Sequence, residues 1–448
     1  MVKEIISFLE NKKVLILGFG REGKSTYNFI RNHLKNQKLY IADMQEDLLD
    51  KNEFLKKDSN IECICGNNYL NGLEDYDIII KTPGISFKGI DTSKFYSKIK
   101  SQLELLLEFF KATTIGITGT KGKSTTSSLI YKVLKDQNIE CMLLGNIGVP
   151  VFDYLDQIKE NMVLVLEMSS HQLEYMEKSP NISILLNIFE EHLDHYESFE
   201  NYAKAKCNIY KYQDTSDFFL YNVDNKTLNK MVKNNLAKTY KVSLENKQEC
   251  DIYLKGDEVY FEDEIIYSKN EPRNLLGDYN LNNIMFVLGV AKILKLDINK
   301  AIKTISDFKT LEHRLEYVGK YDGIDFYDNS IGTIPEATIE AVKALKNVNS
   351  LIIGGMDRNI DYTDFIKFLE DSNIENIICM PKTGHDIAKK IVNKKTFIVN
   401  TMEEAVKTAK QVTKKSSICL LSPAAASYGY FKNFEEKGNI YKELVKKK

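Results

Sequence analysis

Short apolar runs alternate with helix-like stretches along almost the whole chain of 448 residues. Nine of these runs have the length and character of buried strands: "KVLILGF", "KLYIAD", "DIIIKTPG", "TIGITG", "MVLVLEM", "ISILLNI", "SLIIGG", "NIICM" and "SICLLSP". Continuous apolar strands with helices between them form parallel sheets that are covered on both faces. The pattern therefore predicts an α/β protein, and the length predicts two or three domains.

Composition and charge exclude several classes of protein. Hydrophobic residues make up 43% and charged residues 28%, which are globular proportions. The chain has 61 basic and 63 acidic residues, so its net charge is close to zero and we do not expect nucleic acid as its main partner. The opening "MVKEIISFLENKK" lacks the features of a signal peptide and no run of about 18 apolar residues occurs, so we expect no membrane association. Seven irregularly spaced cysteines predict reduced thiols and a cytoplasmic location.

The order of these segments predicts three domains. We expect their bounds at 1–100, 101–309 and 310–448, because the helical "KSQLELLLEFFKAT" and the segment before "EHRLE" separate successive strand systems. The polar stretch from Asp217 to Tyr267 contains "DIYLKGDEVYFEDEIIYS", which is typical of short strands. We expect these strands to form an antiparallel edge within the middle domain.

The first glycine-rich loop is "VLILGFGREGKST". Gly18, Gly20 and Gly23 form G-x-G-x-x-G after an apolar strand, and Asp43 ends the next strand. This spacing is the dinucleotide fingerprint, in which glycines admit a pyrophosphate to a helix N-terminus and the acid holds a ribose hydroxyl. The motif alone fits NAD(P), any other pyrophosphate ligand, or a tight turn that binds nothing.

The second glycine-rich loop, "IGITGTKGKST", is more specific. It supplies a phosphate-binding turn, a lysine for the β- and γ-phosphates and a hydroxyl for magnesium, at Gly122, Lys123 and Ser124 or Thr125. The standard spacing would put a glycine at Ile117, whereas the glycines here are Gly116 and Gly119. The loop is therefore a variant P-loop that predicts a nucleoside triphosphate, and motors, GTPases, kinases and ligases all remain open.

Acidic residues and histidines end two further strands. Glu167 lies near the end of the strand-like run "MVLVLEM", and the next strand leads into a charged segment with Glu190, Glu191, His192, Asp194 and His195. The carboxyl ends of parallel strands share one edge of a sheet, so these groups are expected beside the P-loop. They suit a divalent cation, although solvated loop charges and a helix cap would give the same pattern. Lys206, taken alone, is expected to be a lysine on a helix surface.

The motifs together resemble those of the Mur ligases. "GITGTKGKSTTSSLI", "GNIGVP", "EMSSHQLE", "NIFEEHLDHYESFENYAKAK", "GDYNLNN", "EHRLE" and "LSPAAASYGYFKNFEEKG" occur in that family's order, from Val14 to about Gly438. The resemblance implies a Rossmann-like N-terminal domain for UDP, a central P-loop ATPase domain with a parallel sheet, and a Rossmann-like C-terminal domain that closes on the site. It implies a monomeric enzyme of peptidoglycan precursor synthesis that uses ATP to join D-glutamate to UDP-N-acetylmuramoyl-L-alanine through an acyl phosphate.

The resemblance also implies a role for individual residues. Contacts to the UDP-sugar are expected from Gly20, Asp43, Thr82, Pro83, Gly84 and Asn146. ATP contacts are expected from Gly119, Thr120, Lys121, Gly122, Lys123, Ser124, Thr125, Asn280, Asn283 and Arg314. Ligands of two magnesium ions are expected from Ser124, Glu167, His192 and Lys206, with Lys206 carbamylated by carbon dioxide. Catalytic roles fall to Lys123, Lys206, His192 and Arg314, and the glutamate site to Arg358, Ser427 and Phe434.

One segment departs from the family pattern. "YDNSIGTIPEAT" stands where many relatives have "DSKAT", so Asn329 replaces an acid and Ile331 a lysine; Arg358 also stands where a lysine is common. The added amino acid could therefore be L-glutamate instead. Three other functions also remain open: a folylpolyglutamate synthetase-like ligase, an NAD(P)-dependent oxidoreductase, and a nucleotide sensor without turnover.

Overall fold

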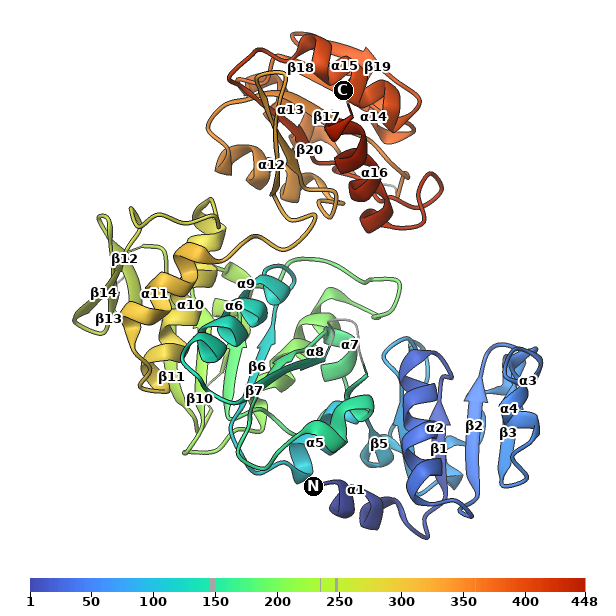
Figure 1. Ribbon diagram of the computed structural model, residues 1–448. Coiled ribbons are helices and arrows are strands. Elements are labelled where there is room, and N and C mark those ends of the chain that lie inside the picture. Colours follow the sequence, from blue (N-terminus) through green and yellow to red (C-terminus); the bar gives the residue numbers. More distant parts are fainter. Residues whose placement is uncertain (146–149, 234, 246–248, 359, 448) are drawn as a thin grey trace. The chain divides into compact units, whose positions relative to one another are not determined.

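The computed structural model describes residues 1–145, 150–233, 235–245, 249–358 and 360–447 (Figure 1). The chain divides into two compact units, of which the first contains Met1–Glu271 with Asn282–Ser306. The second contains Pro272–Leu281 with Asp307–Lys448. All nine apolar runs that we expected to be strands lie in strands of the structure.

The first unit begins with a parallel sheet in the order β3-β2-β1-β4-β5. This is the Rossmann-like order, in which the chain changes direction across the sheet between β1 and β4. The strands are β1 (Val14–Leu17), β2 (Leu39–Asp43), β3 (Ile61–Cys65), β4 (Ile78–Lys81) and β5 (Ile99–Lys100). The helices are α1 (Val2–Leu9), α2 (Arg21–His33), α3 (Leu48–Lys51) and α4 (Glu53–Lys56), with short 3-10 turns at η1 (Gly66–Asn68), η2 (Leu73–Asp75) and η3 (Tyr96–Lys98).

A second sheet in the same unit carries the P-loop. In the described residues its order is β14-β13-β12-β11-β10-β9-β6-β8-β7. The strands are β6 (Thr114–Thr118), β7 (Cys141–Gly145), β8 (Val163–Glu167), β9 (Ile182–Leu185), β10 (Phe218–Asn222), β11 (Lys238–Ser243), β12 (Ile252–Lys255), β13 (Glu258–Phe261) and β14 (Glu264–Ser268). The last three form the antiparallel edge that we expected, whereas β10 and β11, in the same polar stretch, pair parallel.

Helices pack on this central sheet and join it to the N-terminal one. They are α5 (Gln102–Phe109), α6 (Lys123–Asp136), α7 (Ser170–Leu173), α8 (Phe199–Lys211), α9 (Lys226–Met231), α10 (Asp278–Ile293) and α11 (Ile298–Asp307), with the 3-10 helix η4 (Val151–Gln157). Phe29 of α2 packs on Phe152 of η4 with ring centroids 4.6 Å apart, so the two sheets of this unit share one apolar core. Among the described helices, none is both long and apolar enough to cross a bilayer.

The second unit contains a sheet in the order β15-β16-β20-β17-β18-β19. The arrangement β19-β18-β17-β20 repeats that of β3-β2-β1-β4, so this unit is also Rossmann-like. The strands are β15 (Glu316–Tyr321), β16 (Ile324–Asp328), β17 (Val348–Ile353), β18 (Asn376–Cys379), β19 (Lys395–Ile398) and β20 (Ile418–Leu421). The helices are α12 (Pro335–Ala344), α13 (Thr363–Asp371), α14 (Thr383–Ala388), α15 (Met402–Val412) and α16 (Phe434–Lys446).

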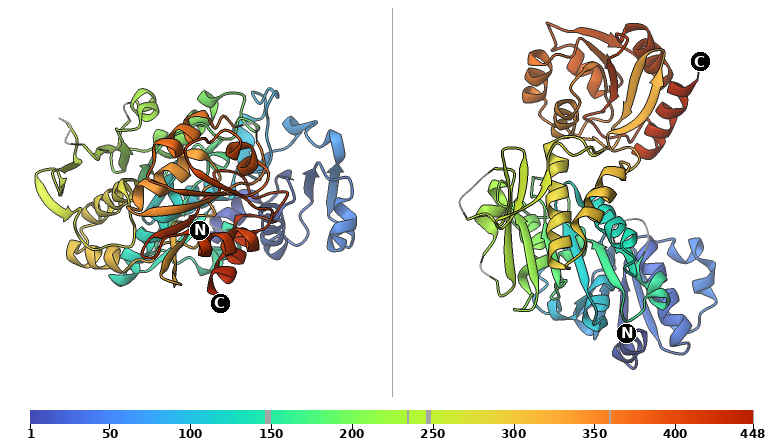
Figure 2. Two further views of the ribbon diagram at one scale, coloured as in Figure 1. Left: turned by 90° about the horizontal axis from the view of Figure 1, so that it is seen from above. Right: turned by 60° about the vertical axis from the view of Figure 1, so that its left-hand side comes forward.

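Helices lie on both faces of this C-terminal sheet (Figure 2). Leu351 and Ile353 of β17 pack in a cluster with residues of α12, α13 and α14, while Ile352 packs with residues of α15 and α16. Successive side chains of a strand point to opposite faces, so a continuous apolar run buries both. This explains why the buried runs in the sequence show no alternation of polar and apolar residues.

Candidate active site

The P-loop connects the end of β6 to the start of α6. The strand ends at Thr118 and the helix begins at Lys123, with Gly122 in a left-handed conformation at φ +88°. A Cβ atom at Gly122 would lie 2.7 Å from Oδ1 of Asn283, so only glycine fits both the backbone angle and the space. The sequence therefore predicted the loop correctly, and Asn283 lies beside it.

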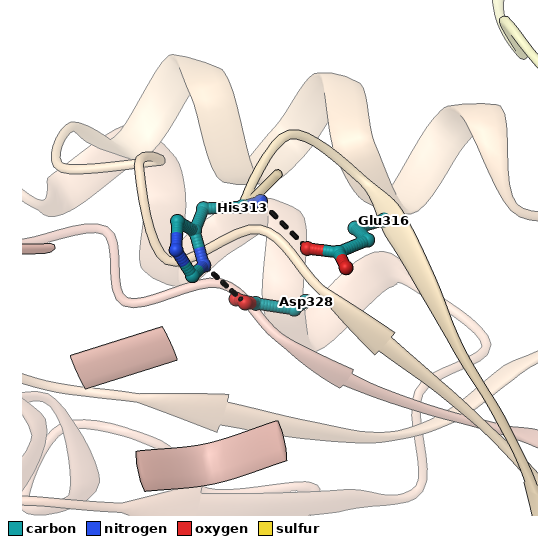
Figure 3. A group of neighbouring side chains, drawn as sticks. All are labelled: His313, Glu316 and Asp328. Carbon is teal, nitrogen blue, oxygen red and sulfur yellow. Dashed lines mark hydrogen bonds and ion pairs between the residues drawn. The ribbon is translucent and has the colours of Figure 1, made fainter. Parts of the chain in front are cut away.

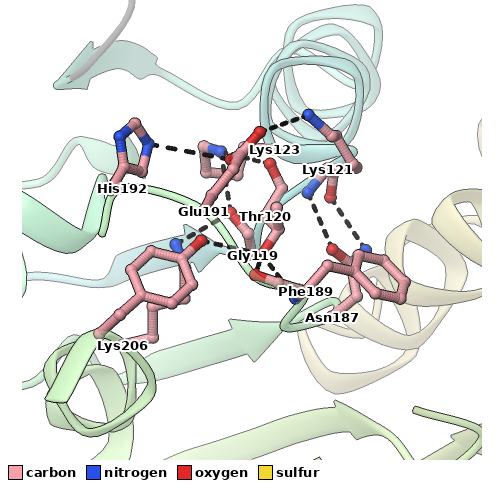
Figure 4. Close-up of polar contacts among 10 residues, drawn as sticks. Gly119, Thr120, Lys121, Lys123, Asn187, Phe189, Glu191, His192 and Lys206 are labelled. Atoms are coloured by element: carbon pink, nitrogen blue, oxygen red, sulfur yellow. Dashed lines mark hydrogen bonds and ion pairs between the residues drawn. The ribbon is translucent and has the colours of Figure 1, made fainter. Parts of the chain in front are cut away.

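The side chain of Lys123 folds back over its own loop (Figure 4). Its Nζ donates to the carbonyl oxygen of Gly119 at 2.8 Å and to that of Thr120 at 3.0 Å. This ammonium lies at the N-terminus of α6, where the backbone N–H groups of the first turn also attract an anion. The oxygens of a bound phosphate could therefore accept the hydrogen bonds that Lys123 now donates to the two carbonyls.

Asn187, which follows β9, holds the P-loop from the neighbouring strand. The backbone N–H of Lys121 donates to Asn187 Oδ1 at 2.8 Å, and Asn187 Nδ2 donates back to the Lys121 carbonyl at 3.0 Å (Figure 4). The N–H of Thr120 also donates to the Asn187 carbonyl at 2.9 Å. We did not predict this role from the sequence, although the position of an asparagine directly after a buried strand was a usable signal.

We expect Asn187→Ala to raise the KM for ATP about tenfold, because alanine cannot make the two side-chain hydrogen bonds that fix the loop. Asn201→Ala on α8 serves as the control, since Asn201 is exposed. Steady-state kinetics on both variants measures the effect. An unchanged KM for ATP in Asn187→Ala would show that the loop keeps its conformation without this side chain.

Lys206 lies in the protein interior. It is 1% exposed, and its Nζ donates to the carbonyl of Gly119 at 3.1 Å and lies 4.9 Å from the ring centroid of Tyr202. Burial lowers the pKa of Lys206 well below its ordinary value, and the positive charge of Lys123 lowers it further. The expectation of a surface lysine, formed from the residue in isolation, was wrong, because α8 packs this side chain against the P-loop.

Two of the residues expected to bind magnesium differ in burial. Glu167, at the end of β8, is 1% exposed, and the hydroxyl of Ser127 lies 3.5 Å from its Oε2. The imidazole of His192 is 45% exposed. Burial lowers the pKa of His192 against the opposing effect of Glu191, so the neutral imidazole that can bind a metal is favoured. A buried carboxylate and a neutral imidazole are suitable ligands for a divalent cation.

The other charged residues of this edge have different partners. Glu191 pairs with the Nζ of Lys121 at 2.7 Å, and His195 Nε2 lies 3.0 Å from Oε2 of Glu174. Although burial alone would raise the pKa of Glu191, Lys121 lowers it. Glu190 and Asp194 are exposed. For these four residues the structure therefore favours the interpretation as loop charges and ion pairs.

The first glycine loop follows β1 at the carboxyl edge of the N-terminal sheet, where β4 is the paired neighbour of β1. Gly18 has φ +88°, and a Cβ atom there would lie 2.2 Å from Oγ1 of Thr82. The structure thus brings this loop, which includes Gly20, next to the turn "TPG" that follows β4. Asp43 Oδ2 accepts from the N–H of Phe19 at 2.6 Å, and its Oδ1 accepts from that of Gln45 at 2.8 Å. Asp43 therefore stabilises both the first glycine loop and its own turn, and its contact to a ribose stays a prediction.

A polar cluster between the two sheets of the first unit was missed in the sequence. Lys81 Nζ lies 3.5 Å from Glu174 Oε2, and both side chains are largely buried. Gln172 Nε2 donates to Glu22 Oε1 at 3.3 Å, and burial raises the pKa of Glu22 to about 6. Burial, with the adjacent His195, lowers the pKa of His171 to about 3. Glu22, Lys81 and the segment 171–174 lie far apart in the chain, and no local pattern relates them.

Comparison with known proteins identifies the family. Residues 117–291 match the family model of the Mur ligase middle domain, and residues 313–425 match that of the Mur ligase, glutamate ligase domain. The UDP-N-acetylmuramoylalanine–D-glutamate ligase of Clostridium kluyveri is 32% identical over 451 residues, which cover 98% of this chain and 97% of that protein. The chain belongs to the Mur ligase family. A protein of the same name from Clostridioides difficile strain 630 is 32% identical over 457 residues, covering 98% and 99%.

Solved Mur ligases share the fold of this chain. MurF ligase from Thermotoga maritima in complex with ADP has a TM-score of 0.60 at 17% identity, with 97% of this chain and 96% of that chain covered. MurC from Thermotoga maritima has a TM-score of 0.58 at 18% identity, covering 97% and 99%. The bifunctional folylpolyglutamate synthase/dihydrofolate synthase of Yersinia pestis has a TM-score of 0.55 at 13% identity, covering 77% and 92%. The likeness confirms the predicted fold class of this Mur ligase.

In the second unit, His313, Glu316 and Asp328 form a polar network close in sequence to Arg314 (Figure 3). His313 Nδ1 lies 2.7 Å from Asp328 Oδ2, and the N–H of His313 donates to Glu316 Oε2 at 2.8 Å. These three residues could offer ligand atoms within 4.8 Å of one another, but Glu316 also pairs with Lys442 at 3.1 Å. We interpret the network as support for the turn that carries Arg314. The approach of Arg314 to ATP stays a prediction.

The residues expected to bind glutamate also belong to this unit. The guanidinium of Arg358 lies 5.9 Å from the ring centroid of Tyr428. Ser427 is 3% exposed, and the ring centroid of Phe434 lies 6.1 Å from that of His313. Their role in binding glutamate stays a prediction.

The departures from the family pattern have structural partners in this chain. Asn329 Nδ2 donates to Ser422 Oγ at 2.9 Å, and its Oδ1 accepts from the N–H of Leu315 at 3.2 Å. Asn329 therefore links β16 to β20 and to the segment after Arg314. The N–H of Ile331 donates to the carbonyl of His313 at 3.3 Å. These contacts fix the segment, and they assign neither residue to a ligand.

The two asparagines expected at adenine lie one turn apart on α10. Asn283 adjoins the P-loop, while Asn280 donates from Nδ2 to the Leu276 carbonyl at 2.8 Å. Asn146, which we expected to contact the muramoyl group, lies outside the described residues. Adenine binding and the muramoyl contact both stay predictions.

Proposed function

We propose that this Mur ligase joins D-glutamate to UDP-N-acetylmuramoyl-L-alanine with hydrolysis of ATP to ADP and phosphate. The observation that carries the proposal is the 32% identity, along 98% of the chain, to proteins named UDP-N-acetylmuramoylalanine–D-glutamate ligase. The first glycine loop then binds a pyrophosphate of UDP rather than of NAD(P). This accounts for the dinucleotide-like spacing, because both ligands contain a pyrophosphate next to a ribose.

The chemistry that we propose is phosphoryl transfer followed by acyl transfer. An oxygen of the alanyl carboxylate attacks the γ-phosphorus of ATP, and ADP leaves. The amine nitrogen of glutamate then attacks the acyl carbon, and inorganic phosphate leaves from a tetrahedral intermediate. The Lys123 ammonium, now held by the carbonyls of Gly119 and Thr120, stabilises the charge on the transferring phosphoryl oxygens.

The described residues fit a magnesium site at the edge of the P-loop sheet. Ser124, Glu167 and His192 would hold the ions, and the Glu167 carboxylate is 1% exposed at the end of β8. A buried carboxylate is costly unless it is paired, and binding a cation would stabilise it. Magnesium supplies Lewis-acid neutralisation of the phosphate oxygens when it is bound. His192 acts as a ligand rather than as a base in this proposal.

Lys206 is the site that we propose for a carbamate. Its depressed pKa favours the neutral amine, which is the form that attacks carbon dioxide: Nζ bonds to the carbon and one proton is released. The product is anionic, so the modification converts a costly buried ammonium beside Lys123 into an oxygen ligand for a cation.

Water must be kept from the acyl phosphate. We propose that the second unit closes on the P-loop when substrates bind, bringing Arg314 to the γ-phosphate, with Arg358, Ser427 and Phe434 at glutamate. Closure of this kind excludes water and completes the site only when all substrates are present.

Phosphate release tests the proposal. The enzyme is mixed with magnesium, ATP and UDP-N-acetylmuramoyl-L-alanine, and phosphate is measured with D-glutamate, with L-glutamate and without an amino acid. We expect release with D-glutamate alone. Release with L-glutamate alone would indicate that the "DNSIGT" segment determines which enantiomer is used. Release with neither amino acid would contradict the proposal and favour a dinucleotide as the ligand of the first glycine loop.

A further inference from the structure

The second unit contains a cavity that the proposed reaction does not use. Its volume is about 360 Å³, which is within the range of small-molecule sites. It lies at the carboxyl ends of β17, β18 and β19, the edge at which open α/β sheets bind ligands. Its lining residues do not include Arg358, Ser427 or Phe434. The cavity is therefore separate from the residues expected to bind glutamate.

The walls of the cavity are largely apolar. They come from the strand ends, from the start of α15, from the segment before α16 and from α16 itself. The apolar residues among them include Met380, Pro381, Met402, Phe431, Ile440 and Leu444. Apolar walls of this kind suit the hydrocarbon or aromatic body of a ligand.

A buried lysine supplies the positive charge of this cavity, whereas Glu403, which also lines it, is exposed to solvent. Lys437, on α16, lines the cavity and is 1% exposed. Its Nζ donates to the carbonyl of Gly354 at 3.2 Å and lies 5.3 Å from the ring centroid of Phe431. In the part of the chain that the structure describes, no carboxylate lies within ion-pair distance of it. Burial lowers the pKa of Lys437 to about 8, so the ammonium remains the main form at neutral pH.

A buried ammonium with one carbonyl acceptor is costly, because the charge has lost its water without gaining an opposite charge. Within the described residues, the other two N–H donors of Lys437 have no hydrogen-bond acceptor. An anion that entered the cavity would supply both the missing acceptors and the opposite charge. The apolar walls would bury the remainder of such a ligand.

We propose that this cavity binds a small carboxylate with an apolar body. The carboxylate lies on Lys437, and the body lies against Met380 and Phe431. Because Phe431 belongs to the same segment as Ser427, an occupant would adjoin the region expected to hold glutamate. The site would thus be a second ligand site of this Mur ligase, independent of the proposed reaction.

The test uses 4-iodobenzoate as the probe and neutral 4-iodobenzamide as its matched control. Isothermal calorimetry at pH 7 measures binding to the full chain, and the anomalous signal of iodine locates the probe in crystals. We expect the benzoate to bind at least about tenfold more tightly than the amide. We also expect Lys437→Met to remove this difference, while Lys432→Met, at an exposed lysine of the same segment, leaves it unchanged.

A second variant tests the cavity without altering the charge. Ile440→Phe fills part of the space from a partly exposed position, and we expect it to weaken benzoate binding at least about tenfold. The inference is wrong if benzoate and amide bind equally, if neither binds, or if iodine is found elsewhere. It is equally wrong if folded Lys437→Met and Ile440→Phe both keep the wild-type affinity.

Discussion

Replacing Lys206 with alanine should lower the rate of phosphate release by about a hundredfold or more. The reason is that the variant lacks the nitrogen that would carry the carbamate, and with it an anionic ligand beside the P-loop. The side chain is buried against the carbonyl of Gly119, so water alone does not replace its function. Phosphate release under saturating substrates measures the loss.

Chemical rescue separates this role from a merely structural one. Acetate or formate added to Lys206→Ala should restore part of the activity, because a small carboxylate can occupy the vacated space. Lys204→Ala is the matched control: Lys204 stands two residues earlier on α8, its side chain is 63% exposed, and it should behave as the wild type. Full activity of Lys206→Ala without any added carboxylate would exclude the carbamate.

Replacing Lys123 with methionine should lower kcat/KM by about 10²- to 10³-fold, the usual cost of removing one charge-stabilising donor from a transition state. Methionine keeps the approximate length of the side chain but cannot donate to phosphate oxygens. The variant should still fold, because the two carbonyls to which the Lys123 ammonium donates, those of Gly119 and Thr120, belong to its own loop.

Lys135→Met on the same helix provides the comparison, since Lys135 is exposed near its C-terminal end. Its kinetics should match those of the unmodified enzyme. If Lys123→Met retained the wild-type kcat/KM, the loop would not be the phosphate-binding element, and the assignment of ATP to this site would be wrong.

Local pattern was sufficient for nine buried strands and for the two glycine-rich loops. An apolar strand, a glycine turn and an amphipathic helix are contiguous in the sequence, so β6, the P-loop and α6 could be recognised without tertiary information. The polar stretch before α10 was only partly predicted. Its antiparallel edge was correct, but β10 and β11 continue the parallel sheet, a pairing set by distant strands.

The burial of Lys206 was not predicted, yet part of the signal was present. Tyr202, Lys206 and Ile209 recur at helical spacing, and all three are buried on one face of α8. A lysine on the apolar face of a helix indicates a buried amine, and a buried amine is typical of a functional site. By contrast, the contact between Lys81 and Glu174 joins the end of β4 to the end of α7, and no periodicity could have revealed it.

Oxygen tracing tests the central claim most directly. UDP-N-acetylmuramoyl-L-alanine carrying a heavy oxygen isotope in its alanyl carboxylate is incubated with the enzyme, magnesium, ATP and D-glutamate, and mass spectrometry analyses both products. The account predicts a D-glutamyl product that has lost one labelled oxygen and inorganic phosphate that has gained it. Unlabelled phosphate, or no D-glutamyl product, would contradict it.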